Sequence, residues 1–229
     1  MVIEHKVSSA DHFETHHSES ETVLCIQHAG NCAVAVEIKD ASDEETRILS
    51  GSIEASVNLL DNYLLQFDTS TGELFPGLLV KIEDGLTESG GEAHADLNQI
   101  VFDRAKNVLS LNNAEQKLVE LGILSTGDWT RTSGSNFDPA SPGSCITYNL
   151  IHEFAHLIDE QGEGTDYEAF DKTVTKYGET KPKESLAEAF THLILGQNIP
   201  DESRLELERI VKLRLSKLRS TIEPSLQNL

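Results

Sequence analysis

His152-Glu153-Phe154-Ala155-His156 is the stretch that decides how this chain is interpreted. Residues four apart lie on one face of an α-helix, so both imidazoles could bind a single metal ion. The glutamate between them would lie beside the metal and accept a proton from a water molecule bound to it. Apolar side chains on both sides of the motif favour a buried helix. These flanking residues are Tyr148, Leu150, Ile151, Leu157 and Ile158.

A third metal ligand is expected downstream, because catalytic zinc sites combine three protein ligands with one position open to water. Glu184 and Glu188 lie four residues apart in a second segment with helical spacing. Two carboxylates on an apolar helix face are costly to bury unless a cation or hydrogen-bond donors balance them. One carboxylate could therefore bind the metal while the other accepts a hydrogen bond from the distal ring N–H of a ligand histidine.

Both segments resemble the signature of anthrax lethal factor-like zinc metallopeptidases. The run from His152 to Asp159, HEFAHLID, is similar to the HEFGHxxD helix of that family. Tyr177-Gly178, then Glu184, then the run 187–190 follow the order of the family's Tyr-Gly…Glu-x-x-Ala-Glu-Ala-Phe pattern. The resemblance therefore extends over residues 148–190.

The resemblance implies a role for each matched residue. His152, His156 and Glu184 would bind one Zn²⁺ per chain. Glu153 would be the general base that activates the zinc-bound water. Tyr177 would stabilise the oxyanion or assist the leaving group. The implied centre is therefore of the two-histidine, one-glutamate type.

Two further carboxylates and some departures belong to the same comparison. Glu188 would orient a ligand histidine, and Asp159 would support the metal-binding helix from the same face. Ala155 stands where the family usually has glycine, and Ser185-Leu186 replaces the usual aromatic pair. These departures bear on the substrate pocket more than on the metal ligands.

Two alternatives for the third ligand stay open. His192 is chemically suited to zinc, but it lies a full turn past the matched positions. Gly164-Thr165-Asp166 is similar to the Gly-Thr-x-Asp motif of zinc peptidases that use aspartate, although the intervening residue is missing. Both candidates therefore rank below Glu184.

The fold implied by the resemblance is an α+β, zincin-like metallopeptidase fold, with a small mixed β-sheet, the active-site helix and a helical C-terminal half. We expect this domain at 44–229, with an N-terminal tail and a β-hairpin accessory segment at 1–43. The implied function is that of a zinc-dependent metalloendopeptidase that hydrolyses peptide bonds of a protein or peptide substrate. The alternatives are a non-catalytic binding or assembly protein that retains a zincin scaffold, and a zinc hydrolase that acts on a non-peptide amide.

Hydrophobic patterns predict elements outside the motifs. Two β-rich runs, 22–28 and 33–39, flank Ala29-Gly30-Asn31 and predict a hairpin. Periodic apolar residues and turn signals place the remaining elements. These are a strand at 78–82 and helices at 44–67, 113–121 and 201–222.

A further strand is predicted at 92–102, where apolar and polar residues alternate after Gly90-Gly91. Zinc peptidases of this architecture hold an extended peptide against an edge strand by main-chain hydrogen bonds. We therefore expect Ala93, His94 and Ala95 to form the edge that faces the substrate.

The composition of the chain limits the classes of partner that it could bind. The formal charge is −21, from 39 acidic and 18 basic residues, and this excess disfavours nucleic-acid binding because it repels phosphate backbones. The start of the chain has no basic segment followed by an apolar run, and no stretch is long enough to span a membrane. We therefore expect a cytoplasmic protein without membrane contact, although a leaderless secreted effector would share these features. The sequence does not indicate the oligomeric state.

The three cysteines predict no disulfide framework. Cys25, Cys32 and Cys145 suit a reducing compartment, and we interpret Cys25 and Cys32 as small core residues. A pairing between these two across the predicted hairpin is the alternative. No role for Cys145 follows from its neighbours.

Overall fold

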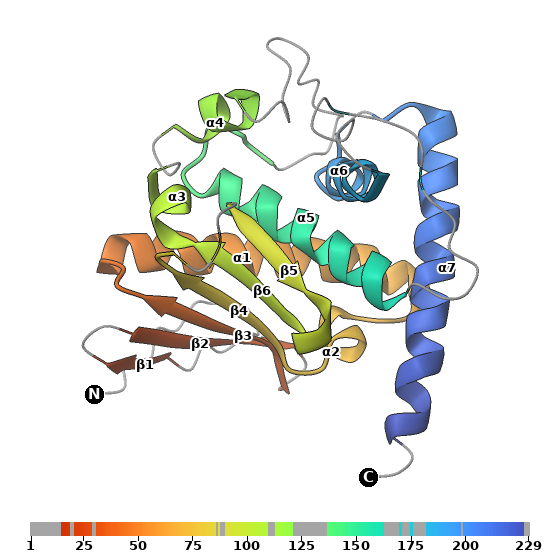
Figure 1. Cartoon of the computed structure of the whole chain (residues 1–229), viewed down its shortest axis with the longest axis horizontal. Coiled ribbons are helices and arrows are strands. Elements are labelled where there is room, and N and C mark those ends of the chain that lie inside the picture. The colour runs from red at the N-terminus through yellow and green to blue at the C-terminus, as the bar shows by residue number, and fades with distance from the viewer. Residues whose placement is uncertain are drawn as a thin grey trace.

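The protein is an α+β structure built on one mixed sheet (Figure 1). The computed structural model describes residues 15–18, 21–28, 31–85, 87, 90–109, 113–120, 137–162, 170, 175, 182–197 and 199–226. The strands are β1 (Thr15–Ser18), β2 (Glu21–His28), β3 (Asn31–Lys39), β4 (Leu78–Glu83), β5 (Gly91–His94) and β6 (Gln99–Asp103). Their order in the sheet is β1-β2-β3-β4-β6-β5, so β5 forms one edge.

The hairpin predicted from the sequence forms between β2 and β3, and its strands are antiparallel. β3 then runs parallel to β4, and β4 runs parallel to β6. The hairpin therefore lies in the same sheet as the strands that follow it. The division of the chain at residue 43 stays a prediction.

The segment predicted as a single strand at 92–102 is instead two antiparallel strands. β5 ends at His94, a 3₁₀ turn η2 (Ala95–Leu97) follows, and β6 begins at Gln99. Asn98 ends the turn in the left-handed region (φ 50°), and its side-chain amide donates to the carbonyl of Pro76 at 3.0 Å. This residue can reverse the chain there because asparagine tolerates the left-handed conformation.

The helices predicted from apolar spacing are confirmed. The helices are α1 (Asp43–Leu64), η1 (Leu65–Phe67), α2 (Thr71–Leu74), α3 (Arg104–Leu109), α4 (Ala114–Glu120), α5 (Ser144–Gln161), α6 (Pro182–Ile194) and α7 (Asp201–Leu226). A capping box begins α1, in which Ser42 accepts from the backbone of Glu45 and the Glu45 carboxylate accepts from the backbone of Ser42. None of the helices in the described ranges is long and apolar enough to cross a membrane.

The core lies between the sheet and the helices. Alternate residues of β3 and β4 are buried, among them Val36 and Ile82, and β6 is buried from Ile100 to Asp103. α5 packs against β5 and β6 on one side and against α1, α6 and α7 on others. α5 is therefore the central helix of the molecule (Figure 1), and both histidines of the sequence motif lie on it.

One expectation about the cysteines is wrong. Cys25 is half-buried and disulfide-bonded, so it is not a free thiol in the core. Cys145, at the start of α5, is buried and free of a disulfide. The sequence expectation failed because pairing depends on which side chains a hairpin brings together, which composition does not show.

Candidate metal centre

The two motif histidines lie on one face of α5, as their spacing predicts. Their Nε2 atoms are 3.2 Å apart, and their rings are nearly perpendicular at 80°. α5 begins after Gly143, whose φ of 82° lies in the left-handed region that favours glycine. His152 is buried, and the side chain of His156 is 14% exposed, so the pair opens toward solvent at His156.

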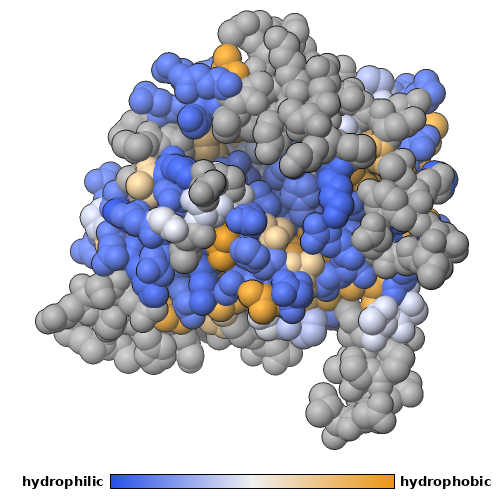
Figure 2. Space-filling view, viewed as in Figure 1, coloured by the Kyte–Doolittle hydropathy of each residue, from blue (hydrophilic) through white to orange (hydrophobic). Residues whose placement is uncertain are grey.

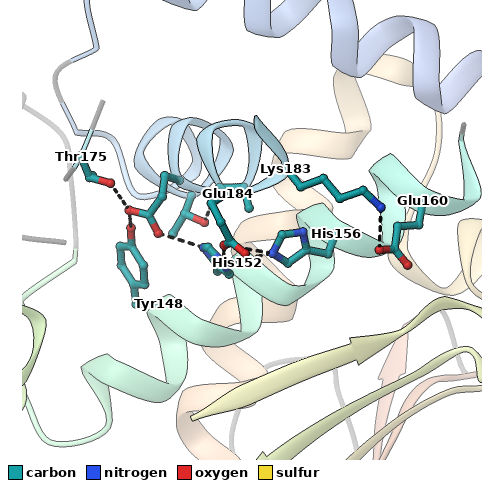
Figure 3. Close-up of polar contacts among 10 residues, drawn as sticks. Tyr148, His152, His156, Glu160, Thr175, Lys183 and Glu184 are labelled. Carbon is teal, nitrogen blue, oxygen red and sulfur yellow. Dashed lines mark hydrogen bonds and ion pairs between the residues drawn. The ribbon is translucent and has the colours of Figure 1, made fainter. Parts of the chain in front are cut away.

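Glu184 approaches the same two nitrogens from α6 (Figure 3). Its Oε2 lies 3.1 Å from Nε2 of His152 and 3.5 Å from Nε2 of His156. Ligand atoms about 2.0–2.1 Å from a tetrahedral zinc ion are about 3.4 Å from one another. The three separations of 3.1, 3.2 and 3.5 Å therefore match one face of such a tetrahedron. This group could bind a metal ion.

Glu188, one turn after Glu184 on α6, contacts the other ring nitrogen of His152. Its Oε1 is 2.9 Å from Nδ1 of His152, on the side of the ring opposite to Glu184. Its Oε2 accepts hydrogen bonds from the hydroxyl of Tyr148 at 2.7 Å and from that of Thr175 at 2.8 Å. A carboxylate beside Nδ1 favours the tautomer that carries its proton on that atom, and this leaves the Nε2 lone pair of a neutral histidine available to a metal.

Glu153 reaches from α5 to β5. A backbone hydrogen bond joins its carboxylate to Ala93. A β-carbon added to Gly91 would lie only 3.3 Å from its Oε1, which shows how closely the edge strand approaches. Burial raises the pKa of Glu153, which is 8% exposed, and the neighbouring histidines lower it in part.

The charges of the centre favour a cation. Burial lowers the pKa of His152, but hydrogen bonds to Glu184 and Glu188 outweigh it and raise that pKa to about 10. Burial likewise raises the pKa of Glu184, and the two histidines outweigh it and hold that pKa well below its usual value. Two carboxylates thus stabilise positive charge at His152, and a divalent metal could supply that charge in place of the proton.

Among the alternative third ligands, His192 is the one that the structure describes. It lies on α6, buried, and its ring packs against the edge of Tyr148 with centroids 6.1 Å apart. It does not belong to the group of ligand atoms formed by His152, His156 and Glu184. Asp166 lies outside the described residues.

Tyr177, expected to assist the reaction, also lies outside the described residues. Asp159 is described, and its contact is with α7. Its Oδ1 accepts a hydrogen bond from Nε of Arg214 at 2.9 Å, and both side chains are buried. Asp159 therefore joins the metal-binding helix to α7, which differs from the support on the metal-facing side that the resemblance implies.

Of the residues expected to face a substrate, Ala93 and His94 lie in the edge strand β5, and Ala95 lies in the turn after it. Asp103 N donates to the carbonyl of Gly90, so Gly90 belongs to a hydrogen-bonded pair of the β5–β6 ladder. Antiparallel pairs alternate, and Ala93 three residues later therefore directs its N–H and C=O away from β6. His94 ends the strand. Ala95 lies in the η2 turn, where its carbonyl accepts from Gln161 of α5 at 2.7 Å.

Sequence reasoning missed the partners of Glu188. Tyr148 precedes His152 by four residues and so shares its helix face, a signal that could have identified it. The apolar residues around it instead favour its interpretation as a packing residue. Thr175 lies between α5 and α6 in a segment without a pattern, so no sequence signal indicated its contact.

Comparisons with known proteins add no assignment. The chain matches no protein-family model, no curated protein and no solved structure. The functional argument therefore depends on the residues of the centre and their geometry.

Proposed function

We propose that the protein is a zinc-dependent metalloendopeptidase with a zincin-like fold, similar to anthrax lethal factor-like peptidases. The observation that carries the proposal is the triangle of ligand atoms from His152, His156 and Glu184, whose edges of 3.1, 3.2 and 3.5 Å suit tetrahedral zinc. Two histidines and one carboxylate are also the ligand set of known zinc peptidases, with a fourth position for water.

The proposed chemistry divides between the metal and the chain. Zinc, when bound, would polarise the scissile carbonyl and lower the pKa of a water molecule to about 7. Glu153 would accept the proton of the attacking water and pass it to the leaving amine. Its burial supports this role, because a raised carboxyl pKa makes it easier for the same group to hold the proton between the two steps.

The edge strand supports a peptide as the substrate. Ala93 directs its backbone N–H and C=O away from β6, and the N–H donates to the carboxylate of Glu153. An extended peptide that paired with β5 would therefore lie beside the general base, held by main-chain hydrogen bonds. Such bonds do not depend on side chains, so they fit cleavage within a chain better than recognition of one small amide.

The test combines two variants with two measurements. Glu153→Gln should retain one zinc per chain by mass spectrometry and lose at least about 10²-fold in cleavage of an unstructured peptide library, because the general base is removed. Glu184→Ala should lose zinc, because one of three ligands is missing. Full cleavage by Glu153→Gln would refute the mechanism.

The same measurements separate the alternatives. Zinc bound by the wild type without cleavage of any peptide would favour a binding or assembly protein on the same scaffold. Cleavage of non-peptide amides alone would favour a zinc hydrolase that acts on a non-peptide amide. A wild type that takes up no zinc from a metal-replete medium would refute both hydrolases and favour the binding or assembly protein.

A further inference from the structure

We infer that Tyr148 and Thr175 are positioning residues of the metal centre, which act on His152 and Glu184 through Glu188. The inference rests on the proposed zinc site and adds residues that the metal-binding motif does not include. Its basis is a chain of contacts that runs from two hydroxyl groups through one buried carboxylate to a metal-ligand imidazole (Figure 3).

The first step is the burial of Glu188. Its side chain is fully buried, and three polar groups surround its two oxygens: two hydroxyls at Oε2 and the imidazole at Oε1. A buried carboxylate is stable only when donors replace the water that it loses. Removal of one hydroxyl would leave Oε2 under-satisfied, and the side chain would then shift toward the donors that remain.

The second step is the shared helix face of α5. Tyr148 and His152 are four residues apart, and their rings lie 24° from parallel with centroids 6.4 Å apart. Both reach the same carboxylate on α6, one at each oxygen. These two contacts from α5 fix the position of the Glu188 carboxylate relative to the imidazole. They therefore hold the ring of His152 in one orientation.

The third step is the spacing on α6. Glu184 precedes Glu188 by four residues, so both project from the same face of that helix. A displacement of Glu188 would therefore rotate or slide the part of α6 that carries Glu184. The separations of 3.1 and 3.5 Å between Glu184 and the two histidines depend on this placement.

Thr175 adds a contact to Glu188 that comes from neither α5 nor α6. It belongs to the connection between them and donates to the same Oε2 as Tyr148. The carboxylate thus receives one hydroxyl from the metal-binding helix and one from the connection. Loss of both hydroxyls should affect the centre more than the sum of the single losses, because each can partly compensate for the other.

The experiment compares zinc affinities, measured by competition with a chromophoric chelator, for wild type, Tyr148→Phe, Thr175→Val and the double variant. Substitutions around metal ligands typically weaken affinity by about 10–100-fold. We expect a loss in this range for Tyr148→Phe, a loss for Thr175→Val, and a larger loss for the double variant. The visible spectrum of the Co²⁺-substituted protein should also change, because the ligand geometry changes.

Tyr63→Phe is the matched control. The Tyr63 hydroxyl oxygen is buried without a hydrogen-bond partner in the described part of the chain, and its ring contacts Phe190 of α6 at 5.5 Å. This variant removes the same atom next to the same helix, from a tyrosine that is not among the groups that act on Glu188. Its zinc affinity and Co²⁺ spectrum should equal those of the wild type.

The outcomes separate this inference from the proposed function. A wild type that binds no zinc overturns both. A wild type that binds zinc, with Tyr148→Phe and Thr175→Val as tight as Tyr63→Phe, overturns the inference alone. If Tyr148→Phe does not fold, Thr175→Val decides in the same way, because it leaves α5 unchanged.

Discussion

Replacement of Asp159 by asparagine should destabilise the protein by about 3–5 kcal/mol, the usual effect of breaking a buried ion pair. The side chains of Asp159 and Arg214 are 2% and 0% exposed, and Nε and Oδ1 are 2.9 Å apart. With an effective dielectric constant of about 20, two unit charges at this distance attract by about 6 kcal/mol before desolvation is subtracted. Removal of the carboxylate charge leaves the guanidinium buried without it, and this penalty dominates the loss.

Urea unfolding of the chelator-treated protein measures the loss directly. With an m-value of about 2 kcal/mol/M, the midpoint should fall by about 1.5–2.5 M. The melting temperature should fall by about 6–20 °C, given about 2–4 °C per kcal/mol for a chain of this size. Glu160→Gln is the control, because its pair with Lys183 is exposed (38% and 46%) and should contribute at most about 1 kcal/mol.

The zinc affinity of the folded variant distinguishes the two roles considered for Asp159. If the residue only joins α5 to α7, Asp159→Asn should bind zinc as tightly as the wild type under conditions where both are folded. A destabilisation below about 1 kcal/mol would refute the reasoning from burial. A tenfold weaker zinc affinity with unchanged stability would instead assign Asp159 to the metal centre.

Two further predictions concern pH and the edge strand. Without metal, the raised pKa of His152 contributes stability that is present below pH 6.5 and lost as the pH rises through about 10. The lowered pKa of Glu184 contributes stability that is present above pH 4.5 and lost as the pH falls below it. Urea midpoints of the chelated protein should therefore decline from pH 7 to pH 10, and a flat profile would contradict the charge arrangement. Gly91→Ala should destabilise the protein by about 1–3 kcal/mol by overpacking, because the added β-carbon would lie 2.5 Å from the buried Phe102 ring. Gly90→Ala is the control, because its β-carbon would meet nothing closer than 3.7 Å. This control should leave the urea midpoint unchanged.

The parts of the centre that local spacing determines were predictable. The helix repeat places residues four apart on one face, which suffices to pair His152 with His156 and Glu184 with Glu188. That Glu184 approaches both histidines was an expectation from resemblance, and the structure brings the three side chains together. The contact of Tyr148 with Glu188 follows the same four-residue rule. It was missed because an apolar neighbourhood makes a tyrosine look like packing alone.

The edge strand shows where local pattern fails. Alternation of apolar and polar residues continues through the η2 turn, so a pattern with a period of two cannot show that the chain reverses there. The reversal depends on Asn98, whose left-handed backbone and bond to Pro76 are tertiary features. The alternating pattern therefore predicts a strand in this segment, whereas the turn that ends β5 at His94 depends on tertiary contacts.

Asp159 shows why a helix face can be predicted while its partner cannot. At about 100° per residue, seven residues bring Asp159 to within about 20° of the direction of His152, so the expectation of a shared face follows from the helix repeat. The same seven residues advance about 10 Å along the axis, at about 1.5 Å per residue. Because of this distance, His152 contacts Glu184 and Glu188 of α6. Asp159 instead contacts Arg214 of α7. Sequence determines the angle at which a side chain leaves α5, but the crossing positions of α6 and α7 determine whether that side chain serves the metal centre or the fold.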